Sequence, residues 1–426
     1  MRLTDGIRDF ARRFRSRRGP DILAGQMAIR VTSFALSVLL IRVLDQETYG
    51  ALVYALTLVS FALPFAGAGI AQGLVRFAAR TDGFRHTLSW SRRALRTGLV
   101  VSLALVVVLW LTAPWLTARL PAARPFLLVF GVMLVTWFVA DIARSALRSV
   151  HLNRLTGRMD MAIAASLVVV GVALLLLHGP LAYAIAYTVI PAVVAGPVLW
   201  RLLRHAESGH DLTDWVEGRR QGLYMGLGNI LAQLLLYADI LMIGNLLAAD
   251  DVAVYKAASL IPFSLVLLPN AVLTTDYVTL ARSSHDGPAI RAYLGRYLRT
   301  FIPLAVVLAA ALWLMRRPVL GLFGPAYADA DGLFALFLVG MTGILVLRTL
   351  MGNLLMAFGY ARANFVLSTA MIAVNLGLNW VLIHAMGLAG AAIATCSIIW
   401  LYGLVAGGVL WRHVQRTSRG EDGADA

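Results

Sequence analysis

The chain has 426 residues, of which 60% are hydrophobic and only 14% are charged, and its mean hydropathy is +0.77. Soluble globular proteins contain about 45–50% apolar and about 25% charged residues, so this composition excludes a soluble protein and predicts an all-α polytopic membrane protein. The net charge of +15 comes almost entirely from arginine, because Lys256 is the only lysine in the sequence. In a membrane protein such an excess sets topology and attracts anionic lipids, so we expect no nucleic-acid partner.

The chain begins with a basic segment, residues 1–20, in which Ile7, Phe10, Ala11 and Phe14 recur at helical spacing. The segment has no apolar core and no small-residue cleavage site, so it does not have the pattern of a signal peptide. We expect a short amphipathic helix on the cytoplasmic surface, in contact with anionic membrane lipids. A disordered basic tail is the alternative.

Apolar runs that can cross a hydrocarbon core of about 30 Å follow this segment. They predict about twelve transmembrane helices, near residues 22–44, 48–75, 97–117, 125–147, 159–178, 181–203, 223–247, 252–275, 298–315, 332–357, 363–386 and 388–411. The loops between them are too short for a soluble catalytic domain. No catalytic residues, metal ligands or cofactor motif stand out, so the sequence predicts a transporter rather than an enzyme.

Basic residues gather in the two tails and in alternate loops, such as "RFAARTDGFRHTLSWSRRALR" and "RLLRHAESGHDLTDWVEGRRQG". The intervening loops, such as "DQET", "HGP" and "AADD", contain few of them. The positive-inside rule therefore predicts that both termini are cytoplasmic.

Two pairs of stretches repeat along the chain at nearly the same spacing. "LIRVLDQETYGALVYA", from Leu40, matches "IGNLLAADDVAVYKAA", which starts 203 residues later at Ile243. "RSALRSVHLNRLTGRMD", from Arg144, matches "RTLMGNLLMAFGYARAN", which starts 204 residues later at Arg348. Parallel repeats of this kind predict two six-helix lobes around a central cavity. The predicted divisions are the N-terminal segment 1–20, an N-terminal lobe 21–205, a cytoplasmic linker 206–221, a C-terminal lobe 222–412 and a cytoplasmic tail 413–426.

Prolines fall inside corresponding spans of the two lobes. Pro64 is expected to interrupt the second span, and Pro262 with Pro269 to interrupt the eighth. Pro191 and Pro197 are expected to break the sixth span. Broken helices in corresponding spans of a transporter indicate a binding site, although a static bend is an equally simple interpretation.

Six ionisable side chains lie within predicted spans, and such groups should face protein or water because lipid cannot solvate them. The set is net cationic and consists of Arg30, Asp141, Arg144, Asp239, Lys256 and Arg348. A cationic cavity suits a diphosphate, since guanidinium groups match phosphate oxygens and lysine adds a movable point charge. We therefore predict that Arg30, Lys256 and Arg348 bind a diphosphate. The alternatives are a structural ion pair for Arg30, and snorkelling to the surface for Arg30 and Lys256.

The remaining polar groups have two interpretations each. Asp141 and Arg144 are three positions apart, a spacing that predicts a pair on one helix face, with charge balance or ligand contact as possible roles. Asp239 could balance a cation or bind a coupling proton or sodium ion. Five further side chains could line the cavity and meet sugar hydroxyls, or could join helices to one another. These are Asn229, Gln233, Asn353, Asn375 and Asn379.

The order of several short motifs resembles the oligosaccharide flippases of the multidrug/oligosaccharidyl-lipid/polysaccharide exporter superfamily. "VLDQETYGALVYA" is similar to the family's first external turn, and "LFGPAYADAD", from Leu322, is similar to the element before the tenth span. "FGYARAN" and "GLAGAAIAT", from Phe358 and Gly387, are similar to elements of the C-terminal lobe. The resemblance covers nearly the whole chain.

This resemblance implies alternating access and outward flipping of an undecaprenyl-diphosphate-linked oligosaccharide in the bacterial cytoplasmic membrane. The polysaccharide being made would be an O-antigen, another lipopolysaccharide part or an exopolysaccharide, and a polymerase and assembly proteins are expected partners. Two other functions stay open. One is a multidrug exporter of the same superfamily, and the other is a non-transporting scaffold of a glycan assembly complex.

Overall fold

The computed structural model describes residues 19–71, 74, 84–150, 152–206, 237–282, 286–358 and 360–418, and every element in these ranges is a helix. Ten of the described helices are long and apolar enough to cross a membrane. The first predicted span corresponds to a further helix, α2 (Gly19–Val43), and helical residues 237–246 correspond to the end of the seventh. The all-helical fold class and the expected set of about twelve spans are therefore confirmed. Most of the N-terminal segment, most of the linker and the end of the tail lie outside the described residues.

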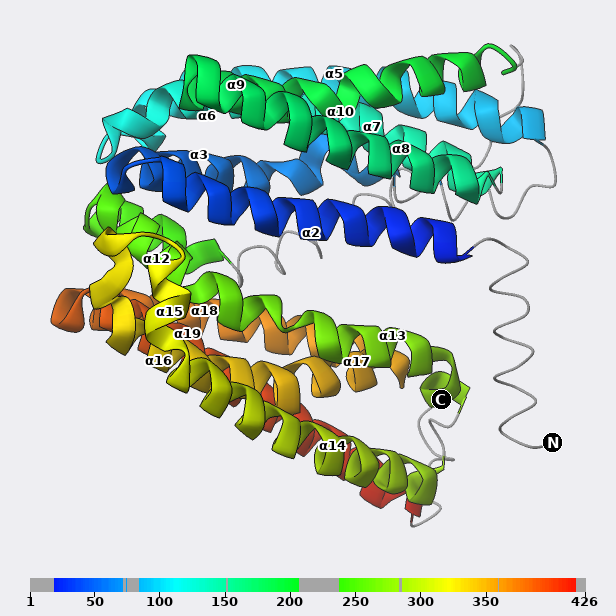
Figure 1. Ribbon diagram of the computed structural model, residues 1–426. Helices are drawn as coiled ribbons and strands as arrows, with labels where there is room; N and C mark the ends of the chain where they lie inside the picture. The colour runs from blue at the N-terminus through cyan, green and yellow to red at the C-terminus, as the bar shows by residue number, and fades with distance from the viewer. Residues whose placement is uncertain are drawn as a thin grey trace. The chain divides into compact units, whose positions relative to one another are not determined.

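The chain forms two compact units. Unit 1 contains residues 1–44 and 51–230, and unit 2 contains residues 45–50 and 231–426. Each unit buries an apolar core of its own, and each is a helical bundle in Figure 1.

The core of unit 1 surrounds α7, which packs against α5 and α10, while α2 runs alongside α8 (Figure 1). Phe138 of α7 is 2% exposed, and its ring lies so close to Gly67 and Gly98 that a Cβ atom at either glycine would be 2.0 Å away. Glycine at these positions therefore lets the ring enter the core. After α2 the elements are α3 (Gln46–Ala62), η1 (Leu63–Gly69), α5 (Phe84–Leu116), η2 (Pro121–Ala123), α6 (Arg124–Gly131), α7 (Met133–Ser149), α8 (Asn153–Ser166), η3 (Leu167–Gly171), α9 (Val172–His178) and α10 (Pro180–Leu203).

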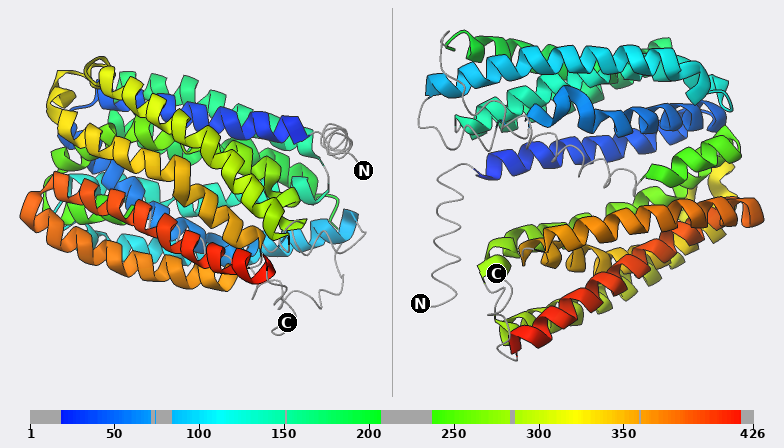
Figure 2. Two further views of the ribbon diagram at one scale, coloured as in Figure 1. Left: turned by 90° about the horizontal axis from the view of Figure 1, so that it is seen from below. Right: turned by 180° about the vertical axis from the view of Figure 1, so that it is seen from behind.

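In unit 2, α16 and α17 pack against α19, and α18 lies beside α19, as the orange and red helices show in Figure 2. Small residues bring α16 and α19 together, because a Cβ atom at Gly340 would be 2.7 Å from Cys396 Sγ. After residues 237–246 the elements are α12 (Ala249–Ser264), α13 (Leu267–Arg282), α14 (Gly287–Leu314), α15 (Arg316–Gly321), η4 (Pro325–Ala330), α16 (Asp331–Gly343), η5 (Ile344–Arg348), α17 (Thr349–Ala357), α18 (Ala361–Met386) and α19 (Leu388–Ser418).

The proline predictions are confirmed in two spans and wrong in one. Helix α3 ends at Ala62, and Pro64 lies in the 3-10 segment η1. The eighth span is interrupted at residues 265–266, between α12 and α13. In contrast, α10 continues through both Pro191 and Pro197. A proline removes one backbone hydrogen bond, and the neighbouring helical turns can keep the helix continuous on both sides of that gap.

Two helices begin earlier than the apolar runs suggest. Helix α5 starts at Phe84 rather than near residue 97, and α14 starts at Gly287 rather than near residue 298. The added turns of α5 are amphipathic, with Leu88 and Trp90 buried and Arg93 exposed. Arginine is a good helix former, so a basic stretch can extend a span beyond the hydrocarbon region.

The short turn before α3 and the first residues of α3, residues 45–50, belong to unit 2. The backbone N–H of Thr48 donates to Asp45 Oδ1 at 2.8 Å, which caps α3 and holds the pKa of the Asp45 carboxyl below its usual value. The side-chain amide of Gln46 donates to the carbonyl of Ala326 at 2.8 Å. At Gly50 the backbones meet, because a Cβ atom there would be 1.8 Å from the carbonyl oxygen of Ala249. A glycine at position 50 is therefore needed for this close approach.

Replacing Gly50 by alanine should destabilise the protein by about 1–3 kcal/mol, because the added methyl group would overlap a backbone oxygen that cannot rotate away. The measurement is the thermal unfolding temperature of the purified protein in detergent. Gly377→Ala is the matched control, because a Cβ atom at this helical glycine meets nothing within 4 Å. Equal unfolding temperatures for the two variants would contradict the role given to Gly50.

Candidate functional site

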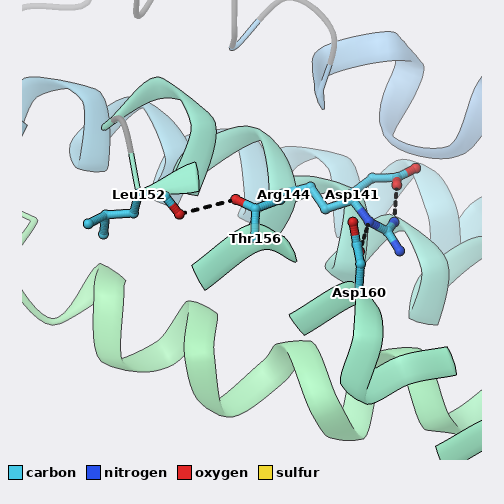
Figure 3. A network of polar contacts seen from close by, with 5 residues as sticks. All are labelled: Asp141, Arg144, Leu152, Thr156 and Asp160. Atoms are coloured by element: carbon cyan, nitrogen blue, oxygen red, sulfur yellow. Dashed lines mark hydrogen bonds and ion pairs between the residues drawn. The ribbon is translucent and has the colours of Figure 1, made fainter. Parts of the chain in front are cut away.

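Arg144 is the centre of an ion network in unit 1 (Figure 3). Its Nη1 atom lies 2.6 Å from Asp141 Oδ1 on the same helix, and its Nε atom lies 2.7 Å from Asp160 Oδ1 on α8. Its guanidinium carbon also lies 5.9 Å from the centre of the Trp137 ring. The predicted contact between Asp141 and Arg144 is therefore present, and a second carboxylate neutralises the same arginine.

The two carboxylates have different surroundings. The Asp160 side chain is 1% exposed, whereas the Asp141 side chain is 57% exposed. A buried carboxylate needs a cation or several donors to remain charged, so Asp160 depends on Arg144 more than Asp141 does. Asp160 was missed in the sequence because it lies sixteen residues from Arg144, on the next helix.

Asp239 is buried in unit 2, at 3% exposure, and is held by hydroxyl groups. Tyr255 of α12 donates to its Oδ2 atom, and Thr395 of α19 donates to the same atom at 3.0 Å. The backbone N–H of Ile240 donates to Oδ1 at 3.1 Å. In the described part of the chain its hydrogen-bond donors are all neutral, and it forms no direct ion pair, although Lys256 lies within electrostatic range of it.

Arg348 has no such neutralising carboxylate among the residues that the structure describes. Its guanidinium carbon lies 5.9 Å from the centre of the Tyr402 ring, within the range of a cation–π contact. The Tyr402 hydroxyl donates to Asn364 Oδ1 on α18. The group in contact with this arginine is therefore an aromatic ring, which stabilises its charge without cancelling it.

The backbone around Arg348 is irregular. Arg348 is the last residue of the π-helical segment η5, and π segments inside α-helices are frequent at functional sites. The Tyr297 hydroxyl donates to the carbonyl of Leu345 within this segment at 2.9 Å, which satisfies a buried backbone acceptor. On the following turn, a Cβ atom at Gly352 would be 3.1 Å from the Tyr402 hydroxyl. Tyr297 and Tyr402 therefore fix the segment that carries Arg348.

The other two predicted phosphate ligands form no direct ion pair in the described ranges, and Lys256 has only a longer-range electrostatic interaction with Asp239. Arg30 is an exposed residue of α2 in unit 1, and Lys256 is a half-buried residue of α12 in unit 2. Neither side chain has a hydrogen bond or ion pair with a described residue. Neither charge is therefore cancelled by a direct ion pair with a described carboxylate.

The predicted polar residues divide into three groups. Asn375 and Asn379 are both buried on α18, and the Asn379 amide donates to Asn375 Oδ1 at 2.9 Å. The Asn353 amide donates to the carbonyl of Thr349 at 2.8 Å, within its own helix. Asn229 and Gln233 lie outside the described residues. These bonds leave Asn379 Oδ1 buried without a partner among described groups.

Comparison of the sequence with known families shows a match over residues 22–274, more than half of the chain, to the family described as polysaccharide biosynthesis protein. The chain is also similar to the succinoglycan biosynthesis transport protein ExoT of Rhizobium meliloti (strain 1021), with 26% identity over 301 residues. That alignment covers 68% of this chain and 59% of the relative, so it spans less than two thirds of the relative's length.

Two solved structures share the fold. The lipid II flippase MurJ in an inward closed conformation is 13% identical with a TM-score of 0.74, over 94% of this chain and 90% of that one. An inward-facing multidrug resistance MATE family transporter of the MOP superfamily is also 13% identical, with a TM-score of 0.70 over 91% of this chain and 95% of that one. At this level of identity the likeness establishes the fold alone.

The Arg144 network predicts an asymmetric response to substitution. Arg144→Ala should destabilise the protein by about 3–5 kcal/mol, because it leaves the Asp160 carboxylate buried without its cation. Asp141→Asn should cost about 1 kcal/mol or less, because Asp141 is exposed. Thermal unfolding of the purified variants measures both effects. Arg144→Ala combined with Asp160→Ala should recover part of the loss, and equal unfolding temperatures for both single variants would refute the assignment.

Proposed function

Because the chain belongs to the polysaccharide biosynthesis protein family, we propose that it is a flippase for a lipid-linked oligosaccharide. The related proteins are transport proteins rather than enzymes, and the chain is a multi-pass membrane protein. The proposed substrate is an undecaprenyl-diphosphate-linked oligosaccharide that moves from the inner to the outer leaflet of the cytoplasmic membrane. The proposed mechanism is alternating access, with Arg30, Lys256 and Arg348 meeting the diphosphate.

The observation that carries this proposal is the pairing of the charges within predicted spans. Arg144 contacts two carboxylates, whereas Arg30, Lys256 and Arg348 contact none among the described residues. An unpaired cation within a span has a high energetic cost, so such residues are rare and usually have a function. A diphosphate is a ligand whose negative charge would compensate the cation. Arginine in particular offers forked donors that match phosphate oxygens.

The proposed location of the protein rests on a different charge pattern, the distribution of basic residues among the loops. We propose that it lies in the bacterial inner membrane with both termini in the cytoplasm, since the basic loops would then face the cytoplasmic side. The glycan would be part of a lipopolysaccharide, an O-antigen or an exopolysaccharide. Anionic lipids, a polymerase and assembly proteins remain proposed partners.

Headgroup translocation in vesicles tests the function directly. The purified protein is reconstituted with a fluorescent polyprenyl-diphosphate oligosaccharide, and the fraction of headgroup accessible to an external quencher is followed in time. Arg348→Ala should raise the substrate concentration needed for half-maximal rate by about 10- to 100-fold, since hydrogen bonds to charged groups contribute about 1.5–3 kcal/mol. Arg30→Ala and Lys256→Ala should act in the same direction.

Two arginines provide matched controls for these variants. Arg42 is exposed near the end of α2, the helix that carries Arg30, and Arg362 is exposed at the start of α18. Arg42→Ala and Arg362→Ala should raise the substrate concentration needed for half-maximal rate by less than Arg30→Ala, Lys256→Ala and Arg348→Ala do. Transport of an organic cation without headgroup translocation would favour the multidrug exporter. No translocation by the wild-type protein, together with polymer output that Arg30→Ala leaves unchanged, would favour the scaffold.

Asp239 is the proposed site of a coupling proton or sodium ion, because its carboxylate is buried and held by neutral donors. Asp239→Asn should abolish any acceleration of translocation by a sodium gradient at fixed pH, or by a pH gradient at fixed sodium. The gradient that accelerates the wild-type protein identifies the ion. If neither gradient changes the wild-type rate, the coupling proposal is wrong.

The membrane potential should also drive export. If two negative charges of the diphosphate cross the field, a negative interior favours outward movement by about 4–5 kcal/mol per 100 mV. Collapsing the potential at fixed ion gradients should therefore slow the wild-type protein, and an unchanged rate would contradict this.

A further inference from the structure

The two matched stretches of the chain place an arginine at the same register in each half, but the partners of the two arginines differ. Arg144 and Arg348 are 204 residues apart. The same spacing applied to Asp160 leads to Asn364, and applied to Asp141 it leads to Leu345. Both carboxylates that neutralise the first arginine are therefore replaced by uncharged residues in the second half.

In the structure each arginine is linked to the residue sixteen positions later, directly in the first half and through a tyrosine in the second. Arg144 on α7 contacts Asp160 on the following helix, α8. Arg348 and Asn364, on η5 and the following long helix α18, are joined through Tyr402, which contacts the guanidinium with its ring and Asn364 Oδ1 with its hydroxyl. Asn364 is thus linked to Arg348 through a single side chain, so an aspartate at this position would add a negative charge close to that contact.

The exchange of a carboxylate for an amide changes the electrostatics more than the packing. Aspartate and asparagine have nearly the same size and shape, but only aspartate carries a negative charge. In surroundings of low dielectric constant, a nearby carboxylate would strongly stabilise the arginine and compete with an incoming anion. An aromatic ring stabilises the guanidinium weakly and leaves its net charge in place, and a neutral amide nearby adds no opposing charge.

We propose that Asn364, together with Leu345, keeps the charge of Arg348 available to a phosphate group, and so determines that the second half binds the anionic part of the substrate. In the first half, Asp141 and Asp160 give Arg144 a structural role. This inference rests on the proposed function and deepens it, because it names residues that select an anionic headgroup without binding it themselves. Asn364 is a positioning residue that acts through Arg348.

The test is Asn364→Asp in the full-length protein reconstituted in vesicles. The KM for the polyprenyl-diphosphate oligosaccharide should rise by about tenfold or more, the range expected when a hydrogen bond to a charged group is lost, with a smaller change in maximal rate. The concentration of inorganic diphosphate that halves the rate should rise in parallel. A variant that merely misfolds would lose maximal rate and unfolding temperature, so the split between KM and maximal rate separates the two cases.

Three further variants complete the test. Asn364→Ser removes the amide without adding charge, so its KM should rise less than that of Asn364→Asp. Asp160→Asn, the reciprocal exchange in unit 1, should keep KM within about twofold, because Arg144 still contacts Asp141. In a chain that already has Arg348→Ala, adding Asn364→Asp should not raise KM any further, because the effects of coupled residues are non-additive.

The outcomes distinguish this inference from the proposed function. If Arg348→Ala leaves KM unchanged, the assignment of Arg348 to the diphosphate fails. If Arg348→Ala raises KM while Asn364→Asp does not, the inference about Asn364 alone is overturned. Equal effects of Asn364→Asp and Asn364→Ser would also overturn it, because the added charge would then play no part.

Discussion

A charged side chain within a membrane span must meet an opposite charge, a set of dipoles or water, and this constraint organises both units of the protein. Arg144 satisfies it with two carboxylates, and Asp239 satisfies it with two hydroxyls and a backbone N–H. Arg348 satisfies it only in part, through the ring of Tyr402. The incomplete compensation of Arg348 is the reason why we propose it as a binding residue, whereas Arg144 is compensated within its own unit.

The helices support this arrangement through close contacts at small residues. In unit 1, glycines of η1 and α5 admit the Phe138 ring, and in unit 2, Gly340 brings α16 against α19. These contacts fix the helices that carry Arg144 and Arg348, so the surroundings of each arginine are set by packing as well as by hydrogen bonds. The π segment η5 adds a local irregularity at Arg348, and Tyr297 supplies the donor that it requires.

The sequence was sufficient for the fold class because apolar runs of membrane length are a strong signal, and the contact of Asp141 with Arg144 followed from helical spacing. It was insufficient for Asp160, Tyr255, Thr395 and Tyr402, since these residues meet their partners across different helices. The start of α5 was misjudged because a basic amphipathic turn can continue a span that hydropathy alone would end. The expected break of α10 was wrong because proline alone does not end a helix that has neighbours on both sides.

Gly352 shows how far the two halves have diverged. It follows Arg148 by 204 residues, so the first half has a long basic side chain where the second has none. The Tyr402 hydroxyl lies 3.1 Å from the place that a Cβ atom would occupy at Gly352, so any larger residue there would press on the ring that covers Arg348. A chimaera with the first stretch grafted in place of the second would therefore lose its fit to α19 along with its free charge. We therefore do not expect the two matched stretches to be interchangeable.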